Sequence, residues 1–135
     1  MKNLYLIALT LLLSVACAAC SGGTSRIEEA TAKMNELCPQ NVSGVGTVKE
    51  FVVDNNMLTI VCVVTNTALK YSEMEADKDN IREQLKITIS SVSRGKLLDV
   101  LREGDTGICY RYLWPDGKKL DFSFPFSEVE QLTKK

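Results

Sequence analysis

The chain has 135 residues, of which 45% are hydrophobic and 24% charged, and its formal net charge at pH 7 is −1. This length suits one domain with a hydrophobic core, and the near-neutral charge without a basic patch argues against nucleic-acid binding. The chain contains no histidine, which excludes Ser-His-Asp and Cys-His catalysis and most catalytic zinc sites. Since the sequence also has no glycine-rich phosphate loop and no metal-ligand spacing, we expect no cofactor and no metal.

The N-terminus has the pattern of an export signal. Lys2 precedes an apolar run from Leu4 to Ala16, which is 13 residues long. As a helix this run would cover only about 20 Å, whereas the hydrocarbon core of a membrane is about 30 Å thick. The pattern is therefore typical of a cleaved secretory signal, with a buried core helix or an uncleaved anchor as the alternatives.

The end of this segment, Val15–Gly23, resembles the lipobox of bacterial lipoproteins. In that family the signal is cut just before a cysteine whose thiol carries a lipid, and small residues precede that cysteine. Cys20 follows two alanines and is the predicted lipidation site, because the Ser-Gly-Gly after it would form a flexible tether. Cys17 also follows small residues and is the alternative. The leucine that the family usually has three positions before the cysteine is replaced here by Cys17 or Ser14.

The resemblance implies a domain organisation and a location. Residues 1–19 would be the cleaved signal, 20–24 the lipidated tether and 25–135 a single domain. More than one acyl chain gives stable anchoring, so the family's behaviour implies a permanent tether to the membrane. Because Ser21 rather than aspartate follows Cys20, the resemblance implies an outer-membrane protein that faces the periplasm. A cleaved signal without a lipid would instead give a free periplasmic protein.

The mature part of the chain keeps an odd number of cysteines. If Cys17 leaves with the signal and Cys20 carries the lipid, then Cys38, Cys62 and Cys109 remain. The periplasm permits disulfides, so one bridge can form among the three while one thiol stays free. These cysteines can equally be small buried hydrophobic residues, as free cysteines often are. The sequence leaves this choice open.

The first half of the domain has the pattern of a helix followed by a hairpin. Ser25-x-x-Glu28 is a capping box, apolar residues follow it at helical spacing, and Pro39 ends the predicted helix. A loop at 41–46 comes next. Two strands joined by an Asp-Asn-Asn turn are predicted after it, at about 47–53 and 57–65. Apolar residues occur at both odd and even positions of the second strand, which indicates a central or doubly buried strand.

The middle of the chain is predicted to be helical. A polar loop at 66–76 leads to a helix that an aspartate caps and that continues to Val92. The segment 84–92 also alternates like a strand, but its length and the cap favour a helix. A short third helix at 97–101 is predicted to close on Gly104.

A second hairpin ends the domain. Strands at about 107–113 and 119–124 flank a Trp-Pro-Asp-Gly turn, and Ser127 begins a last helical turn. The predicted fold class is therefore α+β: an antiparallel sheet of two β-hairpins with helices packed on one face. The order helix, hairpin, helices, hairpin, short helix is a weak internal duplication.

This hairpin carries the strongest candidate site. Tyr110, Tyr112 and Trp114 alternate along one strand and therefore share one face of it. As an exposed row they would bind a partner protein, a small ligand or a glycan, since Tyr and Trp give a large contact area at a small entropy cost. As buried residues they would pack in the core or against the neighbouring strand. The residues between them are mixed in character and do not decide between the two.

Acidic side chains are weaker candidates. Asp116 and Asp121 lie close to these aromatic residues in sequence, but turn chemistry and a solvated face explain them. The acidic run within 73–79 has no EF-hand spacing, so we expect a solvated loop there and not a calcium site.

Three functions fit these observations. The leading hypothesis is a non-catalytic, lipid-anchored interaction module of the cell envelope, whose partners would be the membrane, through the lipid, and an envelope protein or glycan. The second is a glycan or small-ligand binder that uses Tyr110, Tyr112 and Trp114. The third is an enzyme without histidine that uses Cys109 or a pair of carboxylates. The oligomeric state stays open.

Overall fold

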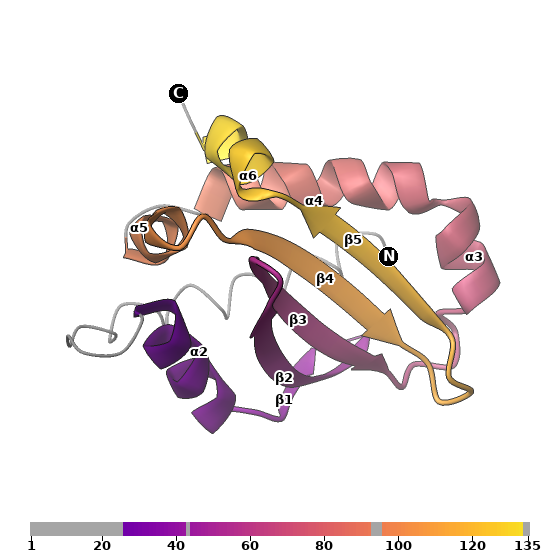
Figure 1. Ribbon diagram of the computed structural model, residues 1–135. Helices are drawn as coiled ribbons and strands as arrows, with labels where there is room; N and C mark the ends of the chain where they lie inside the picture. The colour runs from indigo at the N-terminus through magenta and orange to yellow at the C-terminus, as the bar shows by residue number, and fades with distance from the viewer. Residues whose placement is uncertain (1–25, 43, 93–95, 134–135) are drawn as a thin grey trace.

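The computed structural model describes residues 26–42, 44–92 and 96–133 (Figure 1). The predicted signal peptide, the lipidation site at Cys20 or Cys17, the tether and the Ser25 cap lie outside the described residues. Within the described ranges, no helix is both long enough and apolar enough to cross a membrane.

One sheet and a layer of helices make up the described chain, and the α+β prediction is confirmed. The strands lie in the order β1-β2-β3-β4-β5, so each strand pairs with its neighbour in sequence. The strands are β1 (Gln40–Val42), β2 (Gly46–Asp54), β3 (Met57–Val64), β4 (Gly107–Leu113) and β5 (Lys119–Phe124). The helices are α2 (Arg26–Glu36), α3 (Tyr71–Ala76), α4 (Lys78–Val92), α5 (Lys96–Glu103) and α6 (Phe126–Thr133).

The sheet departs from the prediction at its centre, where β3 and β4 are parallel. The chain leaves the end of β3, passes through α3, α4 and α5, and returns to the start of β3. There the Gly107 N–H donates to the Asn56 carbonyl at 2.9 Å. Such a long crossover lets the next strand run parallel, which a tight turn does not allow. The prediction of a wholly antiparallel sheet is wrong at this pair, and the two hairpin turns consequently lie at opposite ends of the sheet.

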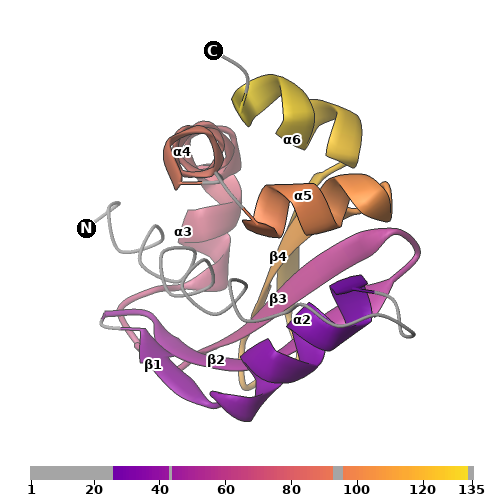
Figure 2. The same cartoon turned by 90° about the vertical axis from the view of Figure 1, so that its left-hand side faces the viewer.

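The helices pack on one face of the sheet, as predicted. On this covered face Leu58 and Ile60 of β3 and Ile108 and Tyr110 of β4 are each at most 2% exposed. Figure 2 shows α4, α5 and α6 grouped together, with α2 lying along β2. The helices add their own buried residues to the same core: Ile27, Ala30, Met34, Ile81, Leu85, Ile89, Val100, Leu101, Phe126 and Val129.

The ambiguous segment 84–92 is helical and forms most of α4. Ile81, Leu85 and Ile89 are fully buried at a spacing of four residues, whereas Ile87 is 64% exposed. A strand would have placed Leu85, Ile87 and Ile89 on one face. The helical period therefore decided the structure of this segment, and one apolar residue stays in solvent as a consequence.

Two short elements were not predicted. The expected loop at 41–46 contains the end of β1, which turns directly into β2 with the Val45 N–H donating to the Val42 carbonyl at 3.0 Å. The expected loop at 66–76 contains α3, whose N-cap residue Lys70 makes no side-chain capping bond. Both elements are short and depend on their neighbours, so neither carries the local signals that identify longer ones.

The turns follow the backbone preferences of their residues. Asn55 and Asn56 both have positive φ, at 52° and 59°, which a two-residue type I′ hairpin requires. Helix α5 closes one residue later than predicted: Asp105, at φ 49°, takes the left-handed position, and Gly104 precedes it. The Thr106 N–H then donates to the Leu101 carbonyl at 2.9 Å, as in a Schellman motif.

Candidate functional site

The predicted aromatic row divides into two parts. Tyr110 and Tyr112 are 2% and 3% exposed on the covered face of β4. Their rings meet Phe124 and Phe122 of β5 edge to face, with centroids 6.3 and 6.0 Å apart. These two tyrosines are core residues and cannot form the exposed row that a binding surface through all three would need. For these two residues the structure has the other arrangement that the sequence allowed, which is packing in the core and against the neighbouring strand.

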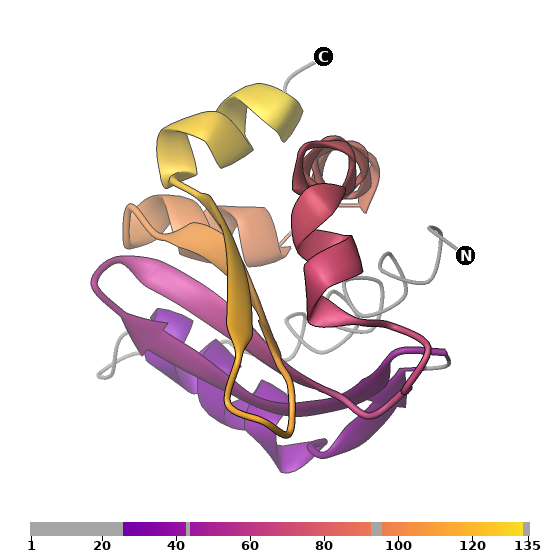
Figure 3. The same ribbon diagram turned by 90° about the vertical axis from the view of Figure 1, so that its right-hand side faces the viewer.

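Trp114 differs because it lies just beyond the end of β4 and is only partly buried. Its indole Nε1–H donates to the Leu69 carbonyl at 2.9 Å, across 45 positions of sequence. Tyr71, the first residue of α3, meets the indole edge to face, with ring centroids 5.3 Å apart and an interplanar angle of 88°. Figure 3 shows α3 beside the β4–β5 hairpin. The indole thus joins the start of the crossover to the second hairpin turn.

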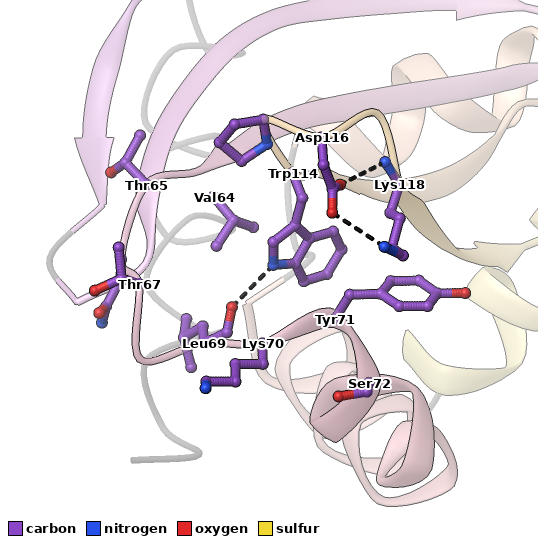
Figure 4. A pocket seen from close by; sticks show the side chains of 12 residues that line it. Val64, Thr65, Thr67, Leu69, Lys70, Tyr71, Ser72, Trp114, Asp116 and Lys118 are labelled. Atoms are coloured by element: carbon purple, nitrogen blue, oxygen red, sulfur yellow. Dashed lines mark hydrogen bonds and ion pairs between the residues drawn. The ribbon is translucent and has the colours of Figure 1, made fainter.

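A cleft of about 350 Å³ opens at this junction, and we refer to it as the aromatic cleft (Figure 4). Its volume is at the lower end of the range for small-molecule sites. In Figure 4 Trp114 lies at the centre, between Leu69 on one side and Asp116 and Lys118 on the other, with Tyr71 next to it. The lining residues are Val64, Thr65, Asn66, Thr67, Leu69, Lys70, Tyr71, Ser72, Trp114, Pro115, Asp116 and Lys118.

The charged groups at the edge of the cleft are already ordered. One carboxylate oxygen of Asp116 accepts from the Lys118 backbone N–H at 3.0 Å, and the other accepts from Lys118 Nζ at 3.1 Å. The backbone N–H of Lys118, followed by its ammonium group, lowers the pKa of Asp116. Tyr71 Oη donates to Glu75 at 3.0 Å, and this hydrogen bond raises the pKa of Tyr71. Lys70 has no ion-pair partner in the described ranges.

Tyr71, Leu69 and Lys70 were not among the predicted site residues, because the polar composition of 66–76 predicts a loop. The available signal was the apolar pair Leu69 and Met74, which are 7% and 3% exposed in an otherwise polar stretch. Two apolar residues five positions apart in a polar stretch indicate a segment that packs against the domain.

The face of the sheet on which no helix of the described chain packs, which we call the open face, holds a second cavity of about 340 Å³. Arg111 crosses it in a two-pronged ion pair, in which Nε and Nη2 donate to the Asp121 carboxylate at 2.9 and 3.0 Å. Cys109 lines the same cavity and is 4% exposed, and the Ser123 hydroxyl donates to its sulfur at 3.5 Å. This arrangement places the Cys109 thiol beside the Ser123 hydroxyl, and the Asp121 carboxylate of the same cavity is held in the ion pair with Arg111.

The three cysteines of the described chain are free. Cys62 lies on the covered face and Cys109 on the open face, so their side chains point in opposite directions from neighbouring strands. Burial raises the pKa of Cys62 to about 11, and burial followed by the nearby Glu50 raises that of Cys38. In the described ranges no group of three or more acidic or cysteine side chains is placed to hold a metal ion.

Comparison with known proteins identifies a similar fold and no family. No protein-family model matches the chain, and no curated protein does. The crystal structure of a protein from Pseudomonas aeruginosa that is inferred to be secreted is similar, with a TM-score of 0.62. The match covers 80% of this chain and 99% of that protein at 15% sequence identity. At this identity the likeness shows the fold and assigns no role to any residue.

Proposed function

We propose that this protein is an exported lipoprotein of the bacterial envelope that binds a ligand without transforming it, and that its binding site is the aromatic cleft. The observation that carries the proposal is the fixed position of Trp114, which two contacts hold in place beside a cleft with polar edges. A site that is ordered before its ligand arrives loses less entropy on binding.

The anchor rests on the N-terminal sequence. The lipobox-like segment places a lipid on Cys20, with Cys17 as the alternative, and Ser21 favours the outer membrane and a periplasmic orientation. The similar fold of a Pseudomonas aeruginosa protein inferred to be secreted supports export.

The cleft lies at the far end of β4 from the first turn of α2, the helix that follows the predicted tether in sequence. Ile27, in the first turn of α2, lies beside Gly104, three residues before β4 begins. Trp114 follows the last residue of β4, and a strand of this length spans about 23 Å. Figure 1 shows α2 and the β4–β5 turn towards opposite ends of the sheet. A lipid at Cys20 would therefore hold the first turn of α2 near the membrane and leave the aromatic cleft at the end of the domain that faces away from the membrane.

Intact mass spectrometry of the protein from its native membrane tests the anchor. We expect a chain that begins at Cys20 and carries two or three acyl groups. A chain without lipid, or one that still contains Lys2, would overturn the anchoring part of the proposal.

Tryptophan fluorescence tests the binding part. Trp114 is the single tryptophan of the chain, so its emission reports on the aromatic cleft without labelling. The purified protein is titrated with separated envelope fractions: cell-wall glycan fragments, peptides, lipid headgroups and small anions. We expect at least one fraction to shift or quench the emission in a saturable way. No response to any class would count against a ligand site in the cleft. Trp114→Phe, which removes the signal, is the control for artefacts.

A further inference from the structure

We infer that the aromatic cleft takes a short, uncharged saccharide, with one sugar ring against the indole of Trp114. This inference rests on the proposed function, because it names the class of ligand for the same cleft.

The indole can offer a ligand only its ring. Its single hydrogen-bond donor is used inside the protein by the Leu69 carbonyl, at 2.9 Å. The ring of Tyr71 stands perpendicular beside it, and its hydroxyl is directed to Glu75. The aromatic part of the cleft therefore selects a ligand with an apolar face. A pyranose ring has such a face, formed by its axial C–H groups, and these match the negative face of an aromatic ring.

The charges at the edge disfavour ionic ligands. Asp116 and Lys118 form an ion pair at 3.1 Å, so neither presents a full charge to the cleft. Lys70 remains as one cation without a described partner. Asp116, Lys118 and Lys70 together leave one net positive charge, so a cationic ligand is repelled, whereas a polyanion meets one unneutralised ammonium group only. A neutral ligand fits this balance.

Hydroxyl groups supply the remaining contacts. Thr65, Thr67 and Ser72 line the cleft and are exposed, and each hydroxyl can donate one hydrogen bond and accept others. The Asn66 amide oxygen is already used by the Ala68 N–H, at 2.9 Å. A ligand that carries several hydroxyls around an apolar ring matches donors and acceptors of this kind. The volume of about 350 Å³ limits the bound part to one or two rings.

The test is a titration of the full lipidated protein in a detergent without a sugar headgroup, followed by Trp114 fluorescence and calorimetry. The probes are an N-acetylglucosamine trimer, cellotriose, maltotriose, polygalacturonate and tetra-alanine. We expect saturable binding of one or more neutral trisaccharides and none of polygalacturonate or tetra-alanine. Preference for the N-acetylglucosamine trimer would point to cell-wall glycan as the source, and preference for a glucose trimer to glucans.

Variants separate the cleft from the rest of the fold. Tyr71→Ala removes one aromatic wall from a partly exposed position, and we expect at least a 10-fold loss of affinity. The paired change Thr65→Val and Thr67→Val should weaken binding several-fold. Arg111→Gln alters the cavity on the open face and should leave affinity within 2-fold. Circular dichroism melts verify that each variant is folded.

Two results would overturn the inference. One is that no neutral saccharide binds while a peptide, lipid or anionic fraction does; the proposed function would then stand without this ligand class. The other is that a saccharide binds but Tyr71→Ala and Arg111→Gln weaken it equally, which would move the site away from the cleft. Failure of every class of ligand would remove the proposed function as well.

Discussion

The two long hairpins, β2–β3 and β4–β5, have similar strands and different turns. Each contributes fully buried residues to the covered face, such as Ile60 from the first and Phe124 from the second. The first turn is the tight Asn55-Asn56 pair, with no aromatic residue. The second begins with Trp114 and contains Gly117 at φ 95°. The strands of both hairpins build the domain, whereas only the second turn takes part in the candidate site.

The parallel pairing of β3 and β4 explains why the two turns can diverge. The first turn lies where β3 begins, near Gly107, and the second lies where β4 ends. If the proposed lipid anchor holds the start of α2 near the membrane, the β2–β3 turn lies close to the membrane and the β4–β5 turn lies far from it. Matched substitutions in the two hairpins test whether they contribute equally to stability while only the second takes part in binding.

The largest loss of stability should come from truncating a core side chain, and it should occur in both hairpins. Phe124→Ala removes a fully buried ring that packs against Tyr110 and lies beneath the guanidinium of Arg82, 4.3 Å from the ring centroid. We expect it to lower the free energy of unfolding by about 3–5 kcal/mol, and Ile60→Ala by about 2–5 kcal/mol. Urea denaturation measures both. Val52→Ala, at a position that is 38% exposed on the open face, is the control and should cost far less.

The next largest effect should come from two glycines at matching places, each at the start of the first strand of its hairpin. A Cβ at Gly46 would collide with the Val63 carbonyl, and one at Gly107 would collide with the Phe124 carbonyl. Because both obstacles are backbone atoms of the paired strand, neither can move cheaply. We expect Gly46→Ala and Gly107→Ala each to cost about 1–3 kcal/mol of unfolding free energy. A thermal melt of either variant that matches the unchanged protein would show that the strands can separate locally.

A smaller effect should distinguish Trp114, just beyond the end of β4, from the buried tyrosines within that strand. Trp114→Phe keeps a ring but leaves the Leu69 carbonyl without its donor, so we expect a loss of about 1–2 kcal/mol. Tyr110→Phe is the matched control, since the buried Tyr110 hydroxyl has no hydrogen-bond partner in the described chain. Its removal should be neutral or stabilising. Chemical denaturation of the two variants side by side would contradict this view if the tyrosine change were the more damaging one.

The smallest effect should be a pH-dependent one at the second turn. Hydrogen bonds from Lys118 lower the pKa of Asp116 below the ordinary value of 3.8. A lowered pKa in the folded state means that the ionised carboxylate stabilises the fold above the unfolded pKa. That contribution is lost as the pH falls through the lower, folded pKa. We therefore expect Asp116→Asn to lower the melting temperature slightly at pH 7 and the difference to vanish in acid. A difference that stays constant from pH 7 to pH 2 would assign the effect to turn geometry instead.

The sequence was sufficient for features that depend on local patterns. Helical spacing, length and the cap identified α4, the Asn-Asn and Pro-Asp-Gly motifs located both hairpin turns, and the apolar runs between these turn signals gave the bounds of the long strands closely. These signals are local because they reflect backbone preferences and the burial period of a single element. The export signal and the candidate lipidation site at Cys20 are also predictions from local sequence, and they lie outside the described residues.

The tertiary structure decided what depends on residues far apart in the chain. The crossover made β3 and β4 parallel, and packing against the helices buried Tyr110 and Tyr112 while leaving Trp114 at the end of the strand. The aromatic cleft exists because Trp114 meets Leu69 and Tyr71, more than 40 positions earlier. Alternation along a strand says which residues share a face, but the elements that dock on that face determine whether it is buried.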